Sequence, residues 1–206
     1  MVERQLRRRG ITDRRVLRAM ANIPRELFLP ESDRANAYRD GAIGIGEGQT
    51  MSQPWIVACM TQLLELDGDE RVLEVGTGSG YGAAVLAVCA REVVTIERYP
   101  TLADQARTVL AKLGLDNVEV RVGDGSKGAP DRAPFDGISV TAAAVEAPPA
   151  ELVSQLAPGA AIVCPVRRGG DEMLVRIRDG REEAVVPVRF VPLVEAPDEP
   201  PDQPAA

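Results

Sequence analysis

Short apolar runs recur through the middle of the chain and alternate with segments of helical spacing. The intervening segments 79–90, 101–113 and 149–156 carry apolar residues at helical intervals. The runs that predict buried strands are 72–75, 93–96, 118–122, 135–140 and 161–166. Strands that alternate with helices are typical of parallel sheets, so the pattern predicts an α/β fold with a doubly wound, mostly parallel sheet.

The two ends of the chain break this alternation. Asp13 precedes a run of helical spacing and is expected to cap it, within short helices that extend to about residue 38. Glycines interrupt residues 41–52, which predicts a long loop, and Pro54 is expected to begin a helix. Near the other end, 172–178 and 184–191 flank Asp179-Gly180 and predict a hairpin, so the sheet should end in an antiparallel strand. Residues 195–206 are rich in proline and acid and are expected to form a disordered tail.

Composition excludes several classes of chemistry. The 206 residues contain no histidine, which rules out Ser-His-Asp and Cys-His nucleophiles and any metal site that needs imidazole, and we expect no metal. A net charge of -7 makes nucleic acid an improbable partner. The three cysteines form no CxxC pair, which favours a reducing cytoplasm over a disulfide framework. No signal peptide or membrane-spanning segment is predicted.

A glycine-rich turn follows the first strand of the alternating region. Gly76, Gly78 and Gly80 let the backbone turn sharply and let a ligand approach it, but Tyr81 occupies the third position of a GxGxxG motif. A dinucleotide-binding oxidoreductase is therefore disfavoured. Glu97 ends the second strand, where a carboxylate can accept hydrogen bonds from ribose hydroxyls, and Asp124 follows the third, within reach of an adenine amino group. Taken singly, the glycines could be ordinary turn residues, and the two acids could be solvated or could cap a turn. The glycine turn, Glu97 and Asp124 together point to S-adenosylmethionine.

The chain resembles the protein-L-isoaspartate O-methyltransferase family over about residues 1–193. The segments that carry this resemblance are PRELFLP at 24–30, GQTMSQP at 48–54, VLEVGTGSGY at 72–81, VGDG at 122–125, APFD at 133–136, VTAA at 140–143 and VRFVPL at 188–193. The glycine motif alone indicates only a class I methyltransferase, whereas the loop ending in SQP and the terminal VRFVPL are more specific. We expect one domain over residues 1–194, with an N-terminal cap (1–53) of helices and loop and a Rossmann-like core (54–194).

The family's activity is methyl transfer from S-adenosylmethionine to the free carboxylate of L-isoaspartyl residues, which starts repair through a succinimide. The resemblance makes Ser52 the active-site residue. It also implies a substrate wall that includes Val191, Pro192 and Leu193. The residues it implies as cofactor contacts are Thr50, Met51, Gly76, Gly78, Glu97, Asp124, Gly125 and Thr141. We expect isoaspartyl proteins and peptides as partners, no membrane or nucleic acid, a monomer, and a cytoplasmic location.

This reaction suits a chain without histidine. A carboxylate with a pKa of about 4 is already ionised at neutral pH, so no general base is needed. Ser52 would orient the substrate by hydrogen bonding, although a serine just before Pro54 could instead cap a helix. Ala42, Gly44, Glu47, Gly82 and Arg132 depart from residues common in the family and leave the peptide preference open.

Two other functions fit the same motifs. One is a carboxyl methyltransferase with a single dedicated peptide substrate, and the other is a module that binds the cofactor or isoaspartyl peptides without turnover.

Overall fold

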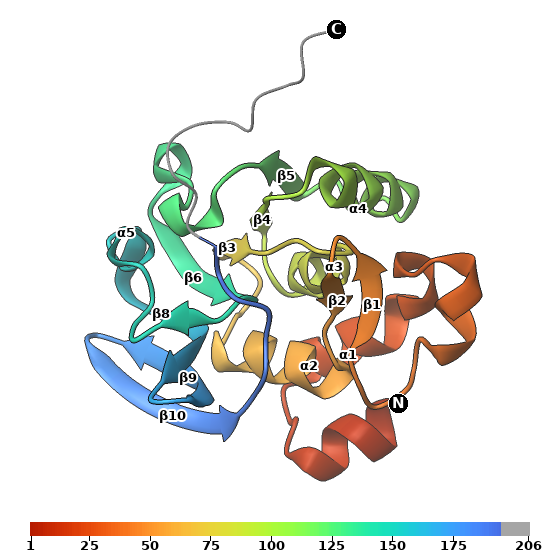
Figure 1. The fold of residues 1–206 in the computed structure, drawn as a ribbon, viewed down its shortest axis with the longest axis horizontal. Helices are drawn as coiled ribbons and strands as arrows, with labels where there is room; N and C mark the ends of the chain where they lie inside the picture. Colours follow the sequence, from red (N-terminus) through yellow and green to blue (C-terminus); the bar gives the residue numbers. More distant parts are fainter. Residues whose placement is uncertain (195–206) are drawn as a thin grey trace, which may run out of the picture.

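A central sheet organises the computed structural model, which describes residues 1–194 (Figure 1). Within those residues the sheet has eight strands, in the order β10-β9-β8-β6-β3-β4-β5, with β7 beside β8. The bounds are β3 Arg71–Val75, β4 Glu92–Glu97, β5 Val118–Val122, β6 Phe135–Val140, β7 Ala144–Val145, β8 Leu156–Arg168, β9 Asp171–Arg178 and β10 Arg181–Pro187. Strands β3, β4, β5, β6 and β8 are parallel, and β9 and β10 are antiparallel additions. The predicted doubly wound, mostly parallel sheet with an antiparallel end is confirmed.

Helices cover both faces of the sheet because side chains alternate along each strand. On β3, Leu73 and Val75 belong to the apolar cluster that holds Leu152 of α5. Val72 belongs to the opposite cluster, with α2, α3 and α4. The bounds of these helices are α2 Pro54–Leu63, α3 Tyr81–Cys89, α4 Pro100–Lys112 and α5 Ala150–Val153. The acid between Leu73 and Val75, Glu74, therefore points toward α3.

The N-terminal residues form a helical layer against α2 and α3. Asp13 caps α1, Arg14–Asn22, by accepting hydrogen bonds from the N–H groups of Arg15 and Val16, which confirms its predicted role. The short turns of this layer are η1 Val2–Leu6, η2 Arg7–Arg9, η3 Arg25–Phe28 and η4 Glu31–Asn36. Phe28 packs edge-on against the ring of Tyr81, with 5.4 Å between ring centroids, and so joins this layer to the first turn of α3.

Residues 41–52 are not the plain loop that their glycines suggest. Strand β1, Ile43–Gly46, pairs antiparallel with β2, Gln49–Met51, through a turn at Glu47 and Gly48, which both have positive φ. Alternation buries Ile45 and Met51. The prediction of a loop was wrong because these few apolar side chains, separated by glycines, are sufficient for a two-stranded hairpin that packs on the rest of the protein.

Three further boundaries differ from prediction. Helix α5 is a single turn, since β8 begins at Leu156 and not near 161. Strand β10 ends at Pro187 and not at 191, although the N–H of Val188 still donates to the carbonyl of Glu172 at 2.9 Å. The segment after Pro187 turns back across the molecule, where Ala143 and Pro192 form an isolated parallel bridge. The short turns η5 Gly125–Lys127 and η6 Pro130–Arg132 follow β5.

The predicted tail, 195–206, lies outside the described residues. Within residues 1–194, no helix is both long and apolar enough to cross a membrane.

Candidate active site

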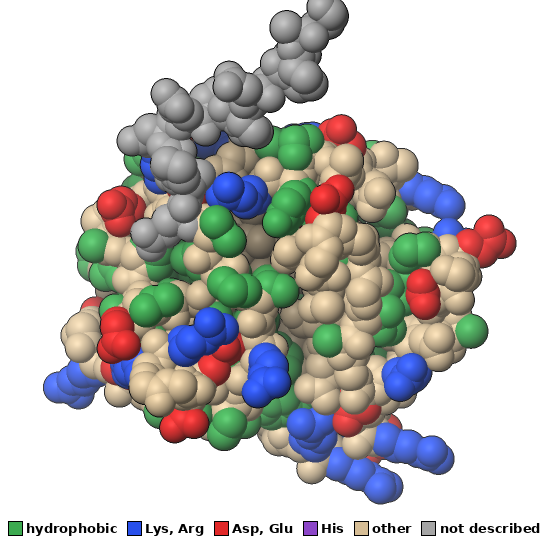
Figure 2. All heavy atoms as spheres, viewed as in Figure 1, with side chains coloured by type: hydrophobic (Ala, Val, Ile, Leu, Met, Phe, Trp, Pro, Cys, Tyr) green, Lys and Arg blue, Asp and Glu red, His purple; other side chains and the backbone are tan. Residues whose placement is uncertain are grey.

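A cavity opens at the carboxyl ends of β3, β4 and β6, where ligands bind in sheets of this kind. It contains about 910 Å³ of space, part of it open to solvent. Figure 2 shows this face hollowed near its centre. The cavity wall comes from the β1–β2 hairpin, the glycine turn after β3, the end of β4, Thr141 after β6, and the segment 191–194.

The turn after β3 leaves no room for a side chain at its first glycine. Gly76 has a φ of +94°, and a Cβ there would lie 2.3 Å from Oγ1 of Thr141. That hydroxyl is held in place because it donates toward the carbonyl oxygens of Val75, at 3.0 Å, and Gly76, at 2.7 Å. Thr141 therefore locks the end of β6 to the glycine turn.

The N–H groups of this turn are engaged within the protein. Those of Gly76 and Thr77 donate to the carbonyl of Ile96, and that of Gly80 donates to Thr77. The N–H of Gly78 donates to Glu97 at 2.7 Å. A phosphate-binding turn needs such groups directed at its ligand, so the geometry agrees with the glycine spacing in disfavouring a dinucleotide.

Glu97 is the acid at the cavity end of β4. Its side chain is 5% exposed and is fixed by two backbone N–H groups, from Gly78 to Oε2 at 2.7 Å and from Tyr99 to Oε1 at 3.0 Å. A carboxylate has about four acceptor positions, which leaves each oxygen free to accept one further bond. This arrangement suits a pair of neighbouring hydroxyls such as those of a ribose.

Glu74 is a second, fully buried acid in the cavity wall, and the sequence did not identify it as a site residue. Its Oε2 accepts a hydrogen bond from Thr95 Oγ1 at 2.6 Å, so the 2.7 Å contact between Thr77 and Thr95 must use the hydroxyl proton of Thr77. Burial raises the pKa of Glu74 to about 8, and the charge of Glu97 acts in the same direction, against the hydrogen bond from Thr95. The sequence signal that could have identified Glu74 is an acid within the apolar run 72–75.

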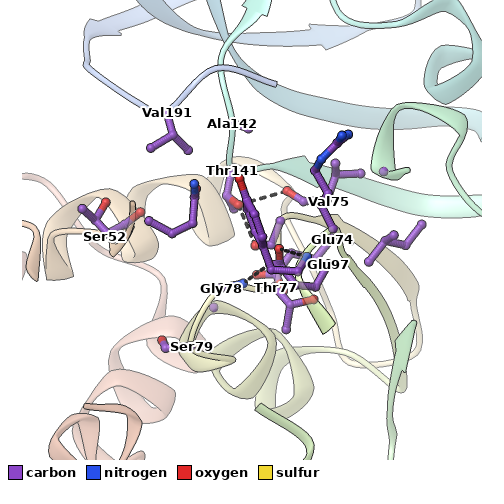
Figure 3. A pocket seen from close by; sticks show the side chains of 18 of the residues that line it. Ser52, Glu74, Val75, Thr77, Gly78, Ser79, Glu97, Thr141, Ala142 and Val191 are labelled. Carbon is purple, nitrogen blue, oxygen red and sulfur yellow. Dashed lines mark hydrogen bonds between the residues drawn. The ribbon is translucent and has the colours of Figure 1, made fainter. Parts of the chain in front are cut away.

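Ser52 lies where this cavity meets a second one. The second cavity is lined by residues 41–42 just before the hairpin, by Thr50, Ser52 and Gln53 at its end, by the first turn of α2, by Thr141 and by residues 187–191. The two cavities share Thr50, Ser52, Thr141 and Val191. Figure 3 shows Ser52 on one side of Thr141 and Glu97 on the other. Helix α2 has Gln53 as its N-cap, with no capping hydrogen bond from a side chain, so the alternative role of Ser52 as a helix cap is not observed.

Residues 191–193 form part of the wall of the first cavity, and Val191 also lines the second. The N–H of Ala143 donates to the carbonyl of Val191 at 2.8 Å, and the N–H of Leu193 donates to the carbonyl of Ala143 at 2.8 Å. These backbone bonds hold the segment beside the end of β6, so that Val191, Pro192 and Leu193 all line the first cavity.

The structure brings most of the sequence-predicted site residues together. Those in the wall of the first cavity are Thr50, Met51, Ser52, Gly76, Gly78, Glu97, Gly125, Thr141, Val191, Pro192 and Leu193. Asp124 is not in that wall. Its carboxylate accepts hydrogen bonds from the N–H of Ser126 at 3.0 Å and from its hydroxyl at 2.7 Å, and so caps the short turn η5.

Two of the residues that depart from those common in the family, Glu47 and Gly82, have contacts that explain them in part. Glu47, at the hairpin tip, accepts a hydrogen bond from Thr101 Oγ1 at 2.8 Å, which ties the hairpin to α4. Gly82 makes room for Glu74, since a Cβ there would lie 2.3 Å from Oε1 of the acid.

The cysteines take no part in the cavity. Cys59, Cys89 and Cys164 are free and buried, and burial raises the pKa of Cys59 to about 11. Among the described residues, no cluster of three or more acidic or cysteine side chains could hold a metal ion.

Comparison with known proteins identifies the family. The model of the Protein-L-isoaspartate(D-aspartate) O-methyltransferase family matches residues 1–198. The chain belongs to this family. It is 52% identical over 198 residues to a protein-L-isoaspartate O-methyltransferase of Methanoculleus marisnigri, covering 94% of this chain and 90% of that protein.

Solved structures of the family share the fold. One protein-L-isoaspartate O-methyltransferase superimposes with a TM-score of 0.84 at 29% identity, covering 95% of this chain; the chain spans 66% of that protein's length. A putative protein-L-isoaspartate O-methyltransferase from Plasmodium falciparum, solved in complex with S-adenosyl-L-homocysteine, gives a TM-score of 0.79 at 25% identity and covers 91% of this chain. The chain therefore has the class I methyltransferase fold.

Proposed function

We propose that this chain transfers a methyl group from S-adenosylmethionine to the free carboxylate of L-isoaspartyl residues in damaged proteins, which starts their repair through a succinimide. The observation that carries the proposal is the junction of the two cavities at Thr50, Ser52, Thr141 and Val191. A cofactor in the first cavity and a peptide in the second would meet there.

The first cavity suits the cofactor. Glu97, with its two remaining acceptor positions, would hold the ribose hydroxyls, while the Gly76–Gly78 turn lets the backbone approach the ligand. Gly125 would border the ring beyond the ribose. When bound, S-adenosylmethionine supplies an electrophilic sulfonium methyl group.

The chain's own residues would bind, orient and exclude water. The substrate carboxylate, with a pKa of about 4, is already ionised at neutral pH, so the site needs no base. The Ser52 hydroxyl has no hydrogen-bond partner among the described residues, which leaves it available to orient that carboxylate. Positioning of this kind lowers a barrier by several kcal/mol without any proton transfer.

The direct test uses matched peptides that contain either isoaspartate or aspartate at one position, with methyl-labelled S-adenosylmethionine. We expect label on the isoaspartyl peptide alone. A dedicated carboxyl methyltransferase would ignore generic isoaspartyl peptides, and a binding module would label neither. Equal labelling of both peptides would also exclude the repair function.

The role of Ser52 has its own test. Ser52→Ala should lower kcat about tenfold to a hundredfold, because an orienting hydrogen bond is lost, while cofactor affinity changes less than about threefold. Ser154→Ala, which removes a hydroxyl at the end of α5, is the matched control and should leave both constants unchanged. Loss of cofactor binding in Ser52→Ala would show that Ser52 serves the cofactor cavity instead.

The domain, assembly and location follow as parts of the same proposal. A single domain over residues 1–194 is supported by the apolar cluster that unites the N-terminal helices with α2, α3 and α4. A monomer is supported by the placement of the exposed large apolar residues Val88 and Val145 on different elements, α3 and β7. Three buried free thiols fit a reducing cytoplasm. Light scattering during size-exclusion chromatography would report the assembly state.

A further inference from the structure

Arg25 is a buried cation that touches the main chain of Ser52. It lies in η3, and its side chain is fully buried. Nε donates to the carbonyl of Ala37 at 2.7 Å, and Nη2 donates to the carbonyl of Ser52 at 2.6 Å. A single guanidinium therefore links the N-terminal layer to the residue at which the two cavities meet.

Among the described residues, no carboxylate forms an ion pair with the Arg25 guanidinium, whose charged neighbours do not include an acid. Nη1 is buried there without a hydrogen-bond partner. The guanidinium instead stacks on the ring of Tyr81, 4.6 Å from its centroid. Burial lowers the pKa of Arg25, although a guanidinium keeps its proton in proteins.

Such an arrangement is costly if its purpose is only to hold two loops together. Burying an unpaired charge opposes folding, and hydrogen bonds to two carbonyls recover only part of that cost. A ligand with negative charge, bound on the far side of Ser52, would supply the missing partner. The substrate of the proposed reaction carries that charge on its reacting carboxylate.

We propose that Arg25 is a positioning residue for the substrate: through the Ser52 main chain it fixes the orienting hydroxyl, and its unpaired charge favours the isoaspartyl carboxylate over a neutral group. This proposal rests on the proposed function of the site. It differs from the role of Ser52 because Arg25 acts without touching the substrate.

Arg9 offers a matched comparison within the same N-terminal layer. Its guanidinium also stacks on an aromatic ring, 4.6 Å from the centroid of Trp55. Arg9 is partly exposed, however, and pairs with Asp40 at 3.2 Å. Solvent and a neighbouring acid thus screen the charge of Arg9, whereas the charge of Arg25 is screened by neither.

The experiment compares two peptides that differ only in charge at the reacting group. One contains isoaspartate with its free α-carboxylate, and the other carries a neutral α-carboxamide there. Calorimetry measures both affinities with S-adenosylhomocysteine bound, so that no turnover occurs. The enzymes are wild type, Arg25→Gln, Arg25→Lys and Arg9→Gln, each checked for its melting temperature and for cofactor affinity.

We expect Arg25→Gln to weaken binding of the charged peptide about tenfold or more while affinity for the neutral peptide changes less than about threefold. Arg25→Lys should restore most of the charge preference but lower kcat, because an ammonium cannot reproduce the fork that grips two carbonyls. Arg9→Gln should leave the ratio of the two affinities as in wild type.

Equal loss of affinity for both peptides in Arg25→Gln would overturn the proposal and leave Arg25 as a structural link. If Arg25→Gln does not fold, Arg25→Lys decides: unchanged kcat with the isoaspartyl peptide would overturn the positioning role. Failure of the proposed function would be distinct, since wild type itself would then not methylate the isoaspartyl peptide.

Discussion

The two ends of strand β4 carry the same amino acid in opposite circumstances. Glu92, at the amino end, accepts a hydrogen bond from Nε of Arg71 at 2.8 Å and forms an ion pair with Arg132. Glu97, at the carboxyl end, is more deeply buried, and its contacts are backbone N–H groups with no cation among the described residues. The first glutamate is neutralised by the protein; the second is oriented but not neutralised.

The contrast extends beyond β4. From Glu92 the charges continue as a chain of pairs on partly exposed side chains: Arg132 with Glu119, Glu119 with Arg121, and Arg121 with Asp131. The hydrogen bond from Arg121 holds the pKa of Asp131 below its ordinary value. Around the cavity, by comparison, Glu74, Glu97 and Arg25 are nearly or fully buried, and none has an ion-pair partner among the described residues.

We propose that the difference separates ionisable groups that serve folding from buried ones that a ligand completes. Surface pairs stabilise a fold weakly and tolerate substitution. A buried group without a counter-charge opposes folding, and such groups gather at sites where a bound molecule completes them. A buried ionisable group without a counter-charge is therefore a better marker of this active site than a charged residue as such.

The sharpest way to break the comparison is to remove each glutamate of β4 in turn. Glu97→Ala should lower affinity for S-adenosylmethionine about a hundredfold or more, since the two charge-assisted hydrogen bonds that we propose to the ribose would be lost. Glu92→Ala, at the other end of the strand, should change it less than about twofold. Calorimetric titration of both variants measures this directly. Similar losses in the two variants would mean that β4 acts only as a scaffold.

The sequence predicted Glu97 but neither Glu74 nor Arg25, for a physical reason. Glu97 follows a strand whose apolar run is local, so its place at the carboxyl end can be inferred from neighbouring residues. Glu74 meets Thr95, and Arg25 meets Ser52, across 21 and 27 positions of sequence. Contacts between residues so far apart in the sequence form only in the folded protein. From the sequence alone, a buried acid or arginine cannot be distinguished from an exposed one.

The same limit explains the hairpin at 43–51. Ile45 and Met51 are buried against elements that come later in the chain. Cδ1 of Ile45, for example, lies so close to Gly78 that a Cβ added to this glycine would be 3.3 Å from it. The local pattern showed only glycines and scattered apolar residues. By contrast, the alternating core was predictable, because each of its elements carries enough apolar residues to indicate its own type.

Glu74 permits a test of intermediate size. Its pKa of about 8 in the folded protein lies above the value of 4.5 for an unperturbed glutamate. Between these two pH values the folded state holds a proton that the unfolded state has lost, so stability should fall as pH rises from about 4.5 to about 8 and then level off. Glu74→Gln removes this dependence.

Urea unfolding without cofactor, at pH 6 and pH 8, measures this contribution. The free energy of unfolding of the wild type should fall by about 2 kcal/mol more than that of Glu74→Gln over this interval. Thr108→Val, which removes an exposed hydroxyl within α4, is a control that should keep the wild-type dependence. If the free energies of unfolding of wild type and Glu74→Gln changed equally with pH, Glu74 would be ionised in the folded protein throughout this interval. Glu74 and Glu92 would then differ only in their interaction partners.

The smallest expected effect lies in the paired charges at the amino end. Arg132→Gln should lower the free energy of unfolding by only about 0.5–1 kcal/mol, because its partners Glu92 and Glu119 are partly exposed and solvent replaces much of the lost attraction. A double-mutant cycle with Glu119→Gln, followed by urea unfolding at low and high salt, isolates the pair, and the coupling should shrink as salt screens it. Methyl transfer should be unchanged. A coupling of several kcal/mol, or reduced activity, would mean that these pairs also maintain the cavity at the far end of the strands, and the division between folding charges and ligand charges would fail.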